Sequence, residues 1–273
     1  MTVKELLEYG NLFLKKEQNK LLLSYILKIN QLEISLHLND IVNNELINDY
    51  KEKVQLINKG EPLQYVLSNA CFYGYNYYVN KNVLIPRFET EELVYETLKY
   101  LKKYIPSGKV LDLCTGSGCI GLTLKQELPP IDMTLSDISQ DALDVACINK
   151  NKYNVDCQII LSDLFENIND KYDCIISNPP YIGYDEEVMD IVKNNEPSLA
   201  LYADNNGLAI YERILKKSKD YLNKKSLIAF ELNSNKSQLI YELAKNYFPD
   251  AKLIIKKDNY QRDRMLFILN DIE

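Results

Sequence analysis

The chain has 273 residues, 46% of them hydrophobic and 26% charged, and this composition excludes an intrinsically disordered protein. The length suits a domain of ordinary size with a smaller companion, so we expect two domains. The net charge of -7 gives no overall attraction to nucleic-acid phosphates, although a local basic surface stays open.

The cysteines and the first residues indicate the cellular compartment. The six cysteines show neither CxxC spacing nor a compact disulfide framework. No segment has the uninterrupted apolar length of a signal peptide or of a membrane span. We therefore expect a cytoplasmic protein with reduced thiols and no membrane partner, and no His/Cys spacing indicates a metal site.

The N-terminal quarter is predicted to be helical. From Val3 to about Leu67 the apolar residues recur at helical spacing, which predicts a small helical domain over 1–69. The aromatic and β-branched residues that follow flank the turn-forming sequence Asn80-Lys81-Asn82. This pattern predicts a β-hairpin linker over 70–88, with its turn at those three residues.

The remainder, 89–273, is predicted to form one α/β domain. A helical segment covers 89–104, and seven short apolar runs then alternate mainly with helical stretches. This order predicts a Rossmann-like, largely parallel seven-stranded sheet covered by helices on both faces, with an antiparallel last strand. The predicted strands are 110–114, 133–137, 158–162, 172–177, 227–232, 252–256 and 264–269.

A glycine-rich turn follows the first predicted strand of this domain. Gly116, Gly118 and Gly121 satisfy the G-x-G-x-x-G pattern of nucleotide-binding turns, which is weakly specific by itself. Glycine lets a ligand approach the backbone, and amides at the start of a helix donate to polar ligand groups. A tight turn with no ligand is the alternative interpretation, and we favour a cofactor site.

Three acidic residues follow strands near this turn. Asp137, at the end of the next strand, is placed to bind the two ribose hydroxyls of an adenosine cofactor, or else to cap the helix that starts near Ser139. Asp112 suits a cationic ligand, such as the sulfonium and ammonium groups of S-adenosylmethionine, better than a pyrophosphate. Asp163 is predicted to accept from the adenine amino group, although a solvated loop acid is nearly as good an explanation.

The most specific signal is Asn178-Pro179-Pro180-Tyr181 directly after an apolar strand. Proline removes N–H donors and holds the loop rigid, so the groups that remain are acceptors. The Asn178 side-chain oxygen and the Pro179 carbonyl can each take one hydrogen of a planar NH2 group and aim its lone pair at a methyl donor. Tyr181 is expected to pack against the flat substrate group.

Taken together, 178–181 and the glycine turn resemble the amino methyltransferases. The segments 60–65 (GEPLQY), 83–91 (VLIPRFETE) and 196–201 (EPSLAL) further resemble the HemK-type release factor glutamine methyltransferases, over almost the whole chain. The resemblance implies methylation, with S-adenosylmethionine, of the glutamine amide in the Gly-Gly-Gln motif of peptide chain release factors. It also implies that the helical domain takes part in gripping that protein substrate.

The resemblance carries roles to individual positions. For the cofactor these are Asp112, Cys114, Thr115, Gly116, Ser117, Gly118, Asp137, Asp163, Leu164 and Asn178. For the substrate they are Asn178, Pro179, Pro180, Tyr181, Arg87 and Glu89. The chain departs from the family pattern at Phe88, where proline is common, at Leu164, where an aromatic residue is common, and at Asn233, where glycine is expected.

Three other functions remain as alternatives. An adenine or guanine amino methyltransferase acting on DNA or ribosomal RNA uses the same acceptor geometry, but the scattered lysine pairs are better explained as solvated helix faces. An NAD-dependent oxidoreductase would need a catalytic acid or base, and the single histidine, His37, lies in the helical domain. A cofactor-binding module without catalysis is the third.

Overall fold

The computed structural model describes residues 1–272 and divides into two compact units. The first unit comprises Met1–Asn69 together with Met189–Asn195, and the second runs from Ala70 to Val188 and resumes at Glu196. The division after Asn69 lies where the sequence changes from helical spacing to an aromatic and β-branched pattern. The short segment Met189–Asn195 groups with the first unit despite its distance in sequence.

The first unit is a helical bundle. Thr2 begins the first helix with a capping box, in which its hydroxyl accepts from the Glu5 amide and the Glu5 side chain accepts from the Thr2 amide. Buried leucines and the buried Tyr50 form its core, and the Tyr50 hydroxyl donates to Asn19 over 2.5 Å. The elements are α1 (Val3–Gly10), α2 (Lys16–Leu27), η1 (Ile34–Leu36), α3 (Asn44–Asn58), α4 (Leu63–Val66) and α8 (Asp190–Asn195).

The second unit opens with a two-stranded hairpin formed by β1 (Ala70–Phe72) and β2 (Tyr75–Tyr77). Its turn lies at Tyr73 and Gly74, both with positive φ, so the predicted turn position at 80–82 was wrong. Gly74 adopts φ of 81° without strain, so the chain reverses there, before it reaches Asn80. Asn80 instead forms a local turn, in which its side chain accepts from the Asn82 amide over 3.0 Å.

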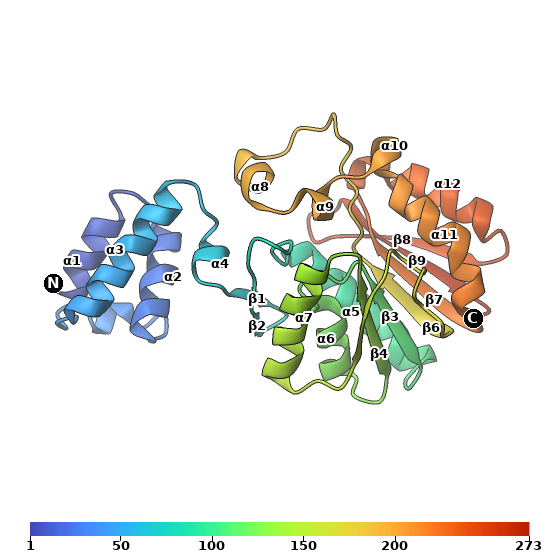
Figure 1. Cartoon of the computed structure of the whole chain (residues 1–273), viewed down its shortest axis with the longest axis horizontal. Coiled ribbons are helices and arrows are strands. Elements are labelled where there is room, and N and C mark those ends of the chain that lie inside the picture. The colour runs from blue at the N-terminus through green and yellow to red at the C-terminus, as the bar shows by residue number, and fades with distance from the viewer. Residues whose placement is uncertain (273) are drawn as a thin grey trace. The chain divides into compact units, whose positions relative to one another are not determined.

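A seven-stranded sheet forms the centre of the second unit, with strand order β5-β4-β3-β6-β7-β9-β8 (Figure 1). All neighbouring pairs are parallel except those of β9, which is antiparallel to both β7 and β8. The predicted Rossmann-like sheet and its antiparallel last strand are therefore confirmed. The strands are β3 (Lys109–Leu113), β4 (Asp132–Asp137), β5 (Gln158–Leu161), β6 (Tyr172–Ser177), β7 (Leu222–Glu231), β8 (Lys252–Lys257) and β9 (Asp263–Asn270).

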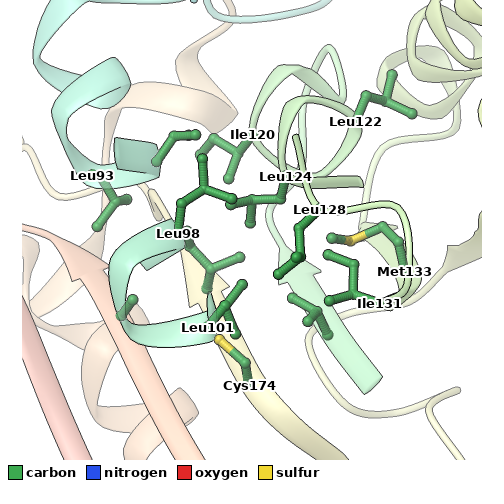
Figure 2. Close-up of a cluster of buried hydrophobic side chains, with 14 of the residues drawn as sticks. Leu93, Leu98, Leu101, Ile120, Leu122, Leu124, Leu128, Ile131, Met133 and Cys174 are labelled. Atoms are coloured by element: carbon green, nitrogen blue, oxygen red, sulfur yellow. The ribbon is translucent and has the colours of Figure 1, made fainter. Parts of the chain in front are cut away.

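Helices cover both faces of this sheet. Successive strand residues point to opposite faces, so β3 sends Val110 toward one hydrophobic cluster and Leu111 toward the other. Figure 2 shows part of the first cluster, in which Leu101 of α5 lies close to Cys174 of β6. The helices are α5 (Phe88–Tyr104), α6 (Cys119–Glu127), α7 (Gln140–Tyr153), α9 (Ser198–Leu201), α10 (Asp204–Gly207), α11 (Ala209–Tyr221), η2 (Ser234–Lys236) and α12 (Ser237–Tyr247).

The strand order reverses between β3 and β6, which are adjacent although two strands separate them in sequence. Leu113 of β3 pairs in register with Ser177 of β6, so both strands end at the same level. A crevice opens at such a reversal because the connecting helices leave toward opposite faces. The glycine turn and the 178–181 segment are thereby brought together at one edge of the sheet.

Candidate functional site

One cavity within the second unit collects most of the side chains that the sequence singled out. It lies at the carboxyl ends of β3, β4, β5 and β6, where ligands of such sheets bind. The predicted residues that line it are Arg87, Cys114, Thr115, Gly116, Ser117, Asp137, Asp163, Leu164, Asn178 and Pro180. Asp112, Gly118, Glu89, Pro179 and Tyr181 are not among the lining residues.

The turn after β3 adopts an unusual backbone conformation. Positive φ angles occur at Cys114, Gly116 and Gly118, with values of 60°, 54° and 80°. At Gly116 an added Cβ would meet nothing within 4 Å, so glycine is favoured there by the backbone angle and leaves open space on the cavity side. Gly121 is required for a different reason, because its Cβ would lie 2.2 Å from the Leu135 side chain. The glycines therefore shape a turn that is open to a ligand and a helix that packs closely on the sheet.

Asp137 ties this turn to the end of β4. One carboxylate oxygen accepts from the Gly116 amide over 2.9 Å, and the other accepts from the Ser139 amide over 3.0 Å. Ser139 itself caps α7, through its hydroxyl and the Ala142 amide. Burial raises the pKa of Asp137, while the amide hydrogen bonds oppose that shift. Both of its oxygens retain further lone pairs for a ligand that enters the cavity.

Asp112 lies beneath the turn and is fully buried. One of its oxygens accepts from the Thr115 hydroxyl over 2.6 Å and from the Gly121 amide over 3.0 Å. Burial raises its pKa to about 7. This position differs from the predicted contact with a cationic ligand: Asp112 acts on the turn from inside and does not face the cavity.

The segment after β5 forms the other side of the same cavity. Asp163 pairs with Arg213 of α11 over 2.7 Å, and both side chains line the cavity. Leu164 has φ of 50° and is held by the Ser162 hydroxyl, which donates to its carbonyl over 2.9 Å. Ile138, half exposed at the end of β4, lies on the same lining. Together these residues offer an apolar surface next to a polar rim.

Asn178 follows β6 directly and lines the cavity. Its side-chain nitrogen lies 3.4 Å from the Thr90 hydroxyl, which donates to the Glu231 carboxylate over 2.6 Å. Among residues 1–272, neither the Asn178 side-chain oxygen nor the Pro179 carbonyl accepts a hydrogen bond from another group. These two acceptors from consecutive residues are thus left without a donor, and of the two residues Asn178 lines the cavity.

Tyr181 closes this part of the site from behind. Its hydroxyl lies 3.3 Å from the second Glu231 oxygen, and its ring contacts the hydrophobic cluster of α11 and α12. Burial raises the pKa of Tyr181, and the nearby Glu231 carboxylate adds to that shift. Burial also raises the pKa of Glu231, against the opposing hydroxyl of Thr90 and the charge of Arg264. Tyr181 supports the loop and does not line the cavity.

Arg87 and Glu89 lie in different surroundings. Arg87 lines the cavity and pairs with the buried Glu196 over 2.5 Å, and the other Glu196 oxygen accepts from the Ile85 amide over 3.1 Å. Glu89 pairs with Arg262 over 3.3 Å, away from the lining residues. The structure therefore brings Arg87, but not Glu89, to the cavity wall.

Several residues of the site carried no signal that the sequence analysis used. Thr90 and Arg213 line the cavity, and Glu196 holds Arg87 in place. Glu231, which the sequence predicts as a buried acceptor although Asn233 stands where glycine is expected, accepts from the Thr90 hydroxyl. Thr90 and Glu196 do lie inside segments that resemble the family, 83–91 and 196–201, so their position in those segments was an unused signal. Arg213 lies in an amphipathic helix where nothing distinguishes it from other exposed cations.

Comparisons with known proteins identify the family of this chain. Family models match residues 91–195, as "Methyltransferase small domain", and residues 5–67, as "PrmC N-terminal domain". A release factor glutamine methyltransferase of Streptococcus pneumoniae is 41% identical over 76% of this chain and 75% of its own length. Another, from Bacillus cereus, is 31% identical over 98% of this chain and 99% of its own. The chain belongs to the release factor glutamine methyltransferases.

Solved structures agree at the level of the fold. A methyltransferase from Pyrococcus furiosus has a TM-score of 0.54 and 16% identity, over 73% of this chain and 91% of its own. Family membership makes this protein a methyltransferase, which confirms the predicted enzyme class and sets aside the oxidoreductase and the module without catalysis. Among the described helices, none combines the length and apolarity needed to cross a membrane.

Proposed function

We propose that this protein transfers a methyl group from S-adenosylmethionine to the side-chain amide nitrogen of the glutamine in the Gly-Gly-Gln motif of release factors. The observation that carries the proposal is the pair of available acceptors, the Asn178 side-chain oxygen and the Pro179 carbonyl, beside a cavity that also contains Asp137. Family membership supports the same substrate, since the curated relatives are named for it. The natural location of such an enzyme is the cytoplasm, where translation occurs.

The lining residues fit the cofactor in both charge and shape. The turn at Gly116 leaves space where a Cβ would stand, and Asp137 offers carboxylate oxygens next to it. We assign the ribose hydroxyls to Asp137, and the adenine to the apolar lining at Ile138 and Leu164, with Asp163 at its rim. S-adenosylmethionine, when bound, supplies an electrophilic methyl group on a positively charged sulfur.

The protein's own residues activate the acceptor nitrogen. An amide nitrogen is a poor nucleophile because its lone pair is delocalised into the carbonyl group. Hydrogen bonds from its two N–H groups to Asn178 and Pro179 draw electron density to nitrogen and orient the lone pair. The N–C bond forms as the C–S bond breaks, and the nitrogen then releases one proton to water. A strong general base is not needed, because the proton leaves after transfer.

Transfer of radiolabelled methyl from S-adenosylmethionine to a purified release factor tests this function. The matched control is the same factor with alanine in place of the Gly-Gly-Gln glutamine. Label on the first factor alone is the expected result. Label on both factors would show that a residue other than this glutamine is methylated. Label on DNA or ribosomal RNA, with none on either factor, would overturn the substrate and favour the nucleic-acid alternative.

A further inference from the structure

Glu231 is a buried carboxylate with no salt bridge in the described part of the chain. It ends β7, next to the end of β6, and only 1% of it is exposed. Its two oxygens accept from two hydroxyls, those of Thr90 over 2.6 Å and Tyr181 over 3.3 Å. A buried carboxyl group without a salt bridge costs stability, so we ask what its two hydrogen bonds hold in place beside the cavity.

The two hydroxyls connect Glu231 with both ends of the 178–181 segment. Tyr181 is the last residue of that segment, and Thr90 lies 3.4 Å from the Asn178 side-chain nitrogen. Thr90 comes from the first turn of α5, so groups from α5, β7 and the loop after β6 meet at one point. Each of these contacts lies inside the second unit.

The proton count in this chain of hydrogen bonds fixes its direction. Both Glu231 oxygens accept, one from Tyr181 and the other from Thr90, so the single hydroxyl proton of Thr90 points at Glu231. Toward Asn178 the Thr90 oxygen then has only lone pairs and can only accept. Its donor is therefore the Asn178 side-chain nitrogen. The reversed amide would place two acceptors against each other. The Asn178 oxygen is therefore turned away from Thr90 and toward the substrate.

We propose that Glu231 and Thr90 are positioning residues, which hold the Asn178 side chain with its oxygen presented to the acceptor nitrogen. This inference rests on the proposed function and adds to it the residues that orient the acceptor. Neither residue needs to contact the substrate. They fix the direction of the hydrogen bonds, because Glu231 accepts from Thr90 and Thr90 therefore accepts from Asn178.

Paired threonine variants on α5 test the proposal. Thr90→Val removes the hydroxyl at nearly constant volume, whereas Thr90→Ser keeps it. Thr97→Val is the matched control, since Thr97 is buried on the same helix and its hydroxyl has no hydrogen-bond partner in the described residues. We expect Thr90→Val to lower kcat about tenfold with unchanged affinity for S-adenosylmethionine, and Thr90→Ser and Thr97→Val to stay within about twofold of the parent.

Glu231→Gln extends the test to the far end of the chain of hydrogen bonds. Glutamine has nearly the same shape but can donate, which removes the fixed direction. A fall in kcat comparable with that of Thr90→Val is expected, with a urea midpoint close to that of Thr97→Val. A parental kcat in both variants, or equal losses in Thr90→Ser and Thr90→Val, would overturn the proposal.

A spectroscopic measurement separates this proposal from the choice of substrate. In 15N-labelled protein, the Asn178 side-chain NH2 signals are identified by their absence in Asn178→Ala. We expect Thr90→Val, but not Thr90→Ser, to shift the proton that is hydrogen-bonded in the parent. If the parent fails to methylate release factors yet this shift occurs, the substrate is wrong and the positioning is retained. Unchanged signals in Thr90→Val would reject the positioning whatever the substrate.

Discussion

The two ends of the cavity are built by different means. At the first end, the single side chain of Asp137 holds the main-chain amides of Gly116, in the turn after β3, and of Ser139, which follows β4. At the loop after β6, the Asn178 side chain is held by other side chains, Thr90 and through it Glu231. Each end also rests on a fully buried carboxyl group, Asp112 at the first and Glu231 at the second.

The two ends of the cavity therefore need different kinds of residues in the sequence. A backbone site needs glycine at particular positions and one acid, all within a short stretch or at the next strand end. A side-chain site draws residues from 141 positions apart, as Thr90 and Glu231 are, so its parts are brought together only by the fold. Substitutions at the first end should alter cofactor binding, and substitutions at the second should alter the chemical step.

The largest effect is expected from Asn178→Ala. Loss of one of two acceptors for the reacting nitrogen should lower kcat by about 10²- to 10³-fold, as loss of one group that stabilises a transition state does. Affinity for S-adenosylmethionine, measured by calorimetry, should stay within about threefold of the parent. Turnover close to that of the parent would remove the acceptor role from Asn178.

Asp137→Ala should show the opposite pattern. It removes the acceptor assigned to the ribose and the link between Gly116 and Ser139, so the Kd for S-adenosylmethionine should rise roughly 10- to 100-fold. At saturating cofactor, kcat should fall much less. Asp170→Ala is the control, because Asp170 pairs with Lys109 at the opposite edge of the sheet. Equal affinity in the parent and in Asp137→Ala would contradict the assignment.

Asp112→Asn should change how stability depends on pH. The folded-state pKa of Asp112 is raised to about 7, so the folded protein keeps a proton that the unfolded chain loses near pH 4. The free energy of unfolding therefore receives a contribution that is full below pH 4 and is lost as the pH rises to 7.

In Asp112→Asn this loss is absent. The fall in unfolding free energy between pH 4 and pH 7 should be smaller than in the parent by an amount on the order of 3 kcal/mol. Urea unfolding at several pH values measures it. Parallel curves for the two proteins would show that Asp112 is ionised beneath the turn throughout this range.

The sheet was predictable because its strands are short buried runs whose residues pack on both faces. The run 172–177 was predicted with the same bounds as β6. A parallel strand that is buried on both faces requires a continuous apolar run, and such a run is visible in the sequence. The hairpin turn was misplaced because Asn80, Lys81 and Asn82 carry a stronger general turn preference than Tyr73-Gly74. Strand pairing of Ala70 with Tyr77 decided the position, and pairing is not visible in local preference.

The site was predictable where one residue type is needed for a backbone angle or for a rigid loop. Gly116 and the prolines after Asn178 are such residues. Thr90 was not found and Glu231 was predicted only as a buried acceptor, because a threonine in a helix and an acid ending a strand have many ordinary explanations. Their common role becomes visible only in the structure, where the Thr90 hydroxyl donates to Glu231 over 2.6 Å.

The departures from the family pattern also have local explanations. Phe88 begins α5, a position where proline is favoured but not required, and its side chain is exposed. Asn233 has φ of -69°, so no glycine is needed, and its side chain donates to Glu186 over 3.3 Å. Leu164 keeps its place on the cavity wall with a positive φ.

The loop after Tyr181 is closed at its base by two main-chain hydrogen bonds within the second unit. The Ile182 amide donates to the Leu201 carbonyl over 3.0 Å, and the Ala203 amide donates to the Ile182 carbonyl over 2.9 Å. Nearby, Gly207 is required by close packing, since its Cβ would lie 2.1 Å from the Tyr181 carbonyl. Because lengthening a loop closed at its base costs little free energy, the mostly exposed residues 187–194 can change in length and sequence, whereas Glu196 is constrained by its contact with Arg87. Residues 187–194 can thus change during evolution while residues 178–181 keep their position at the cavity.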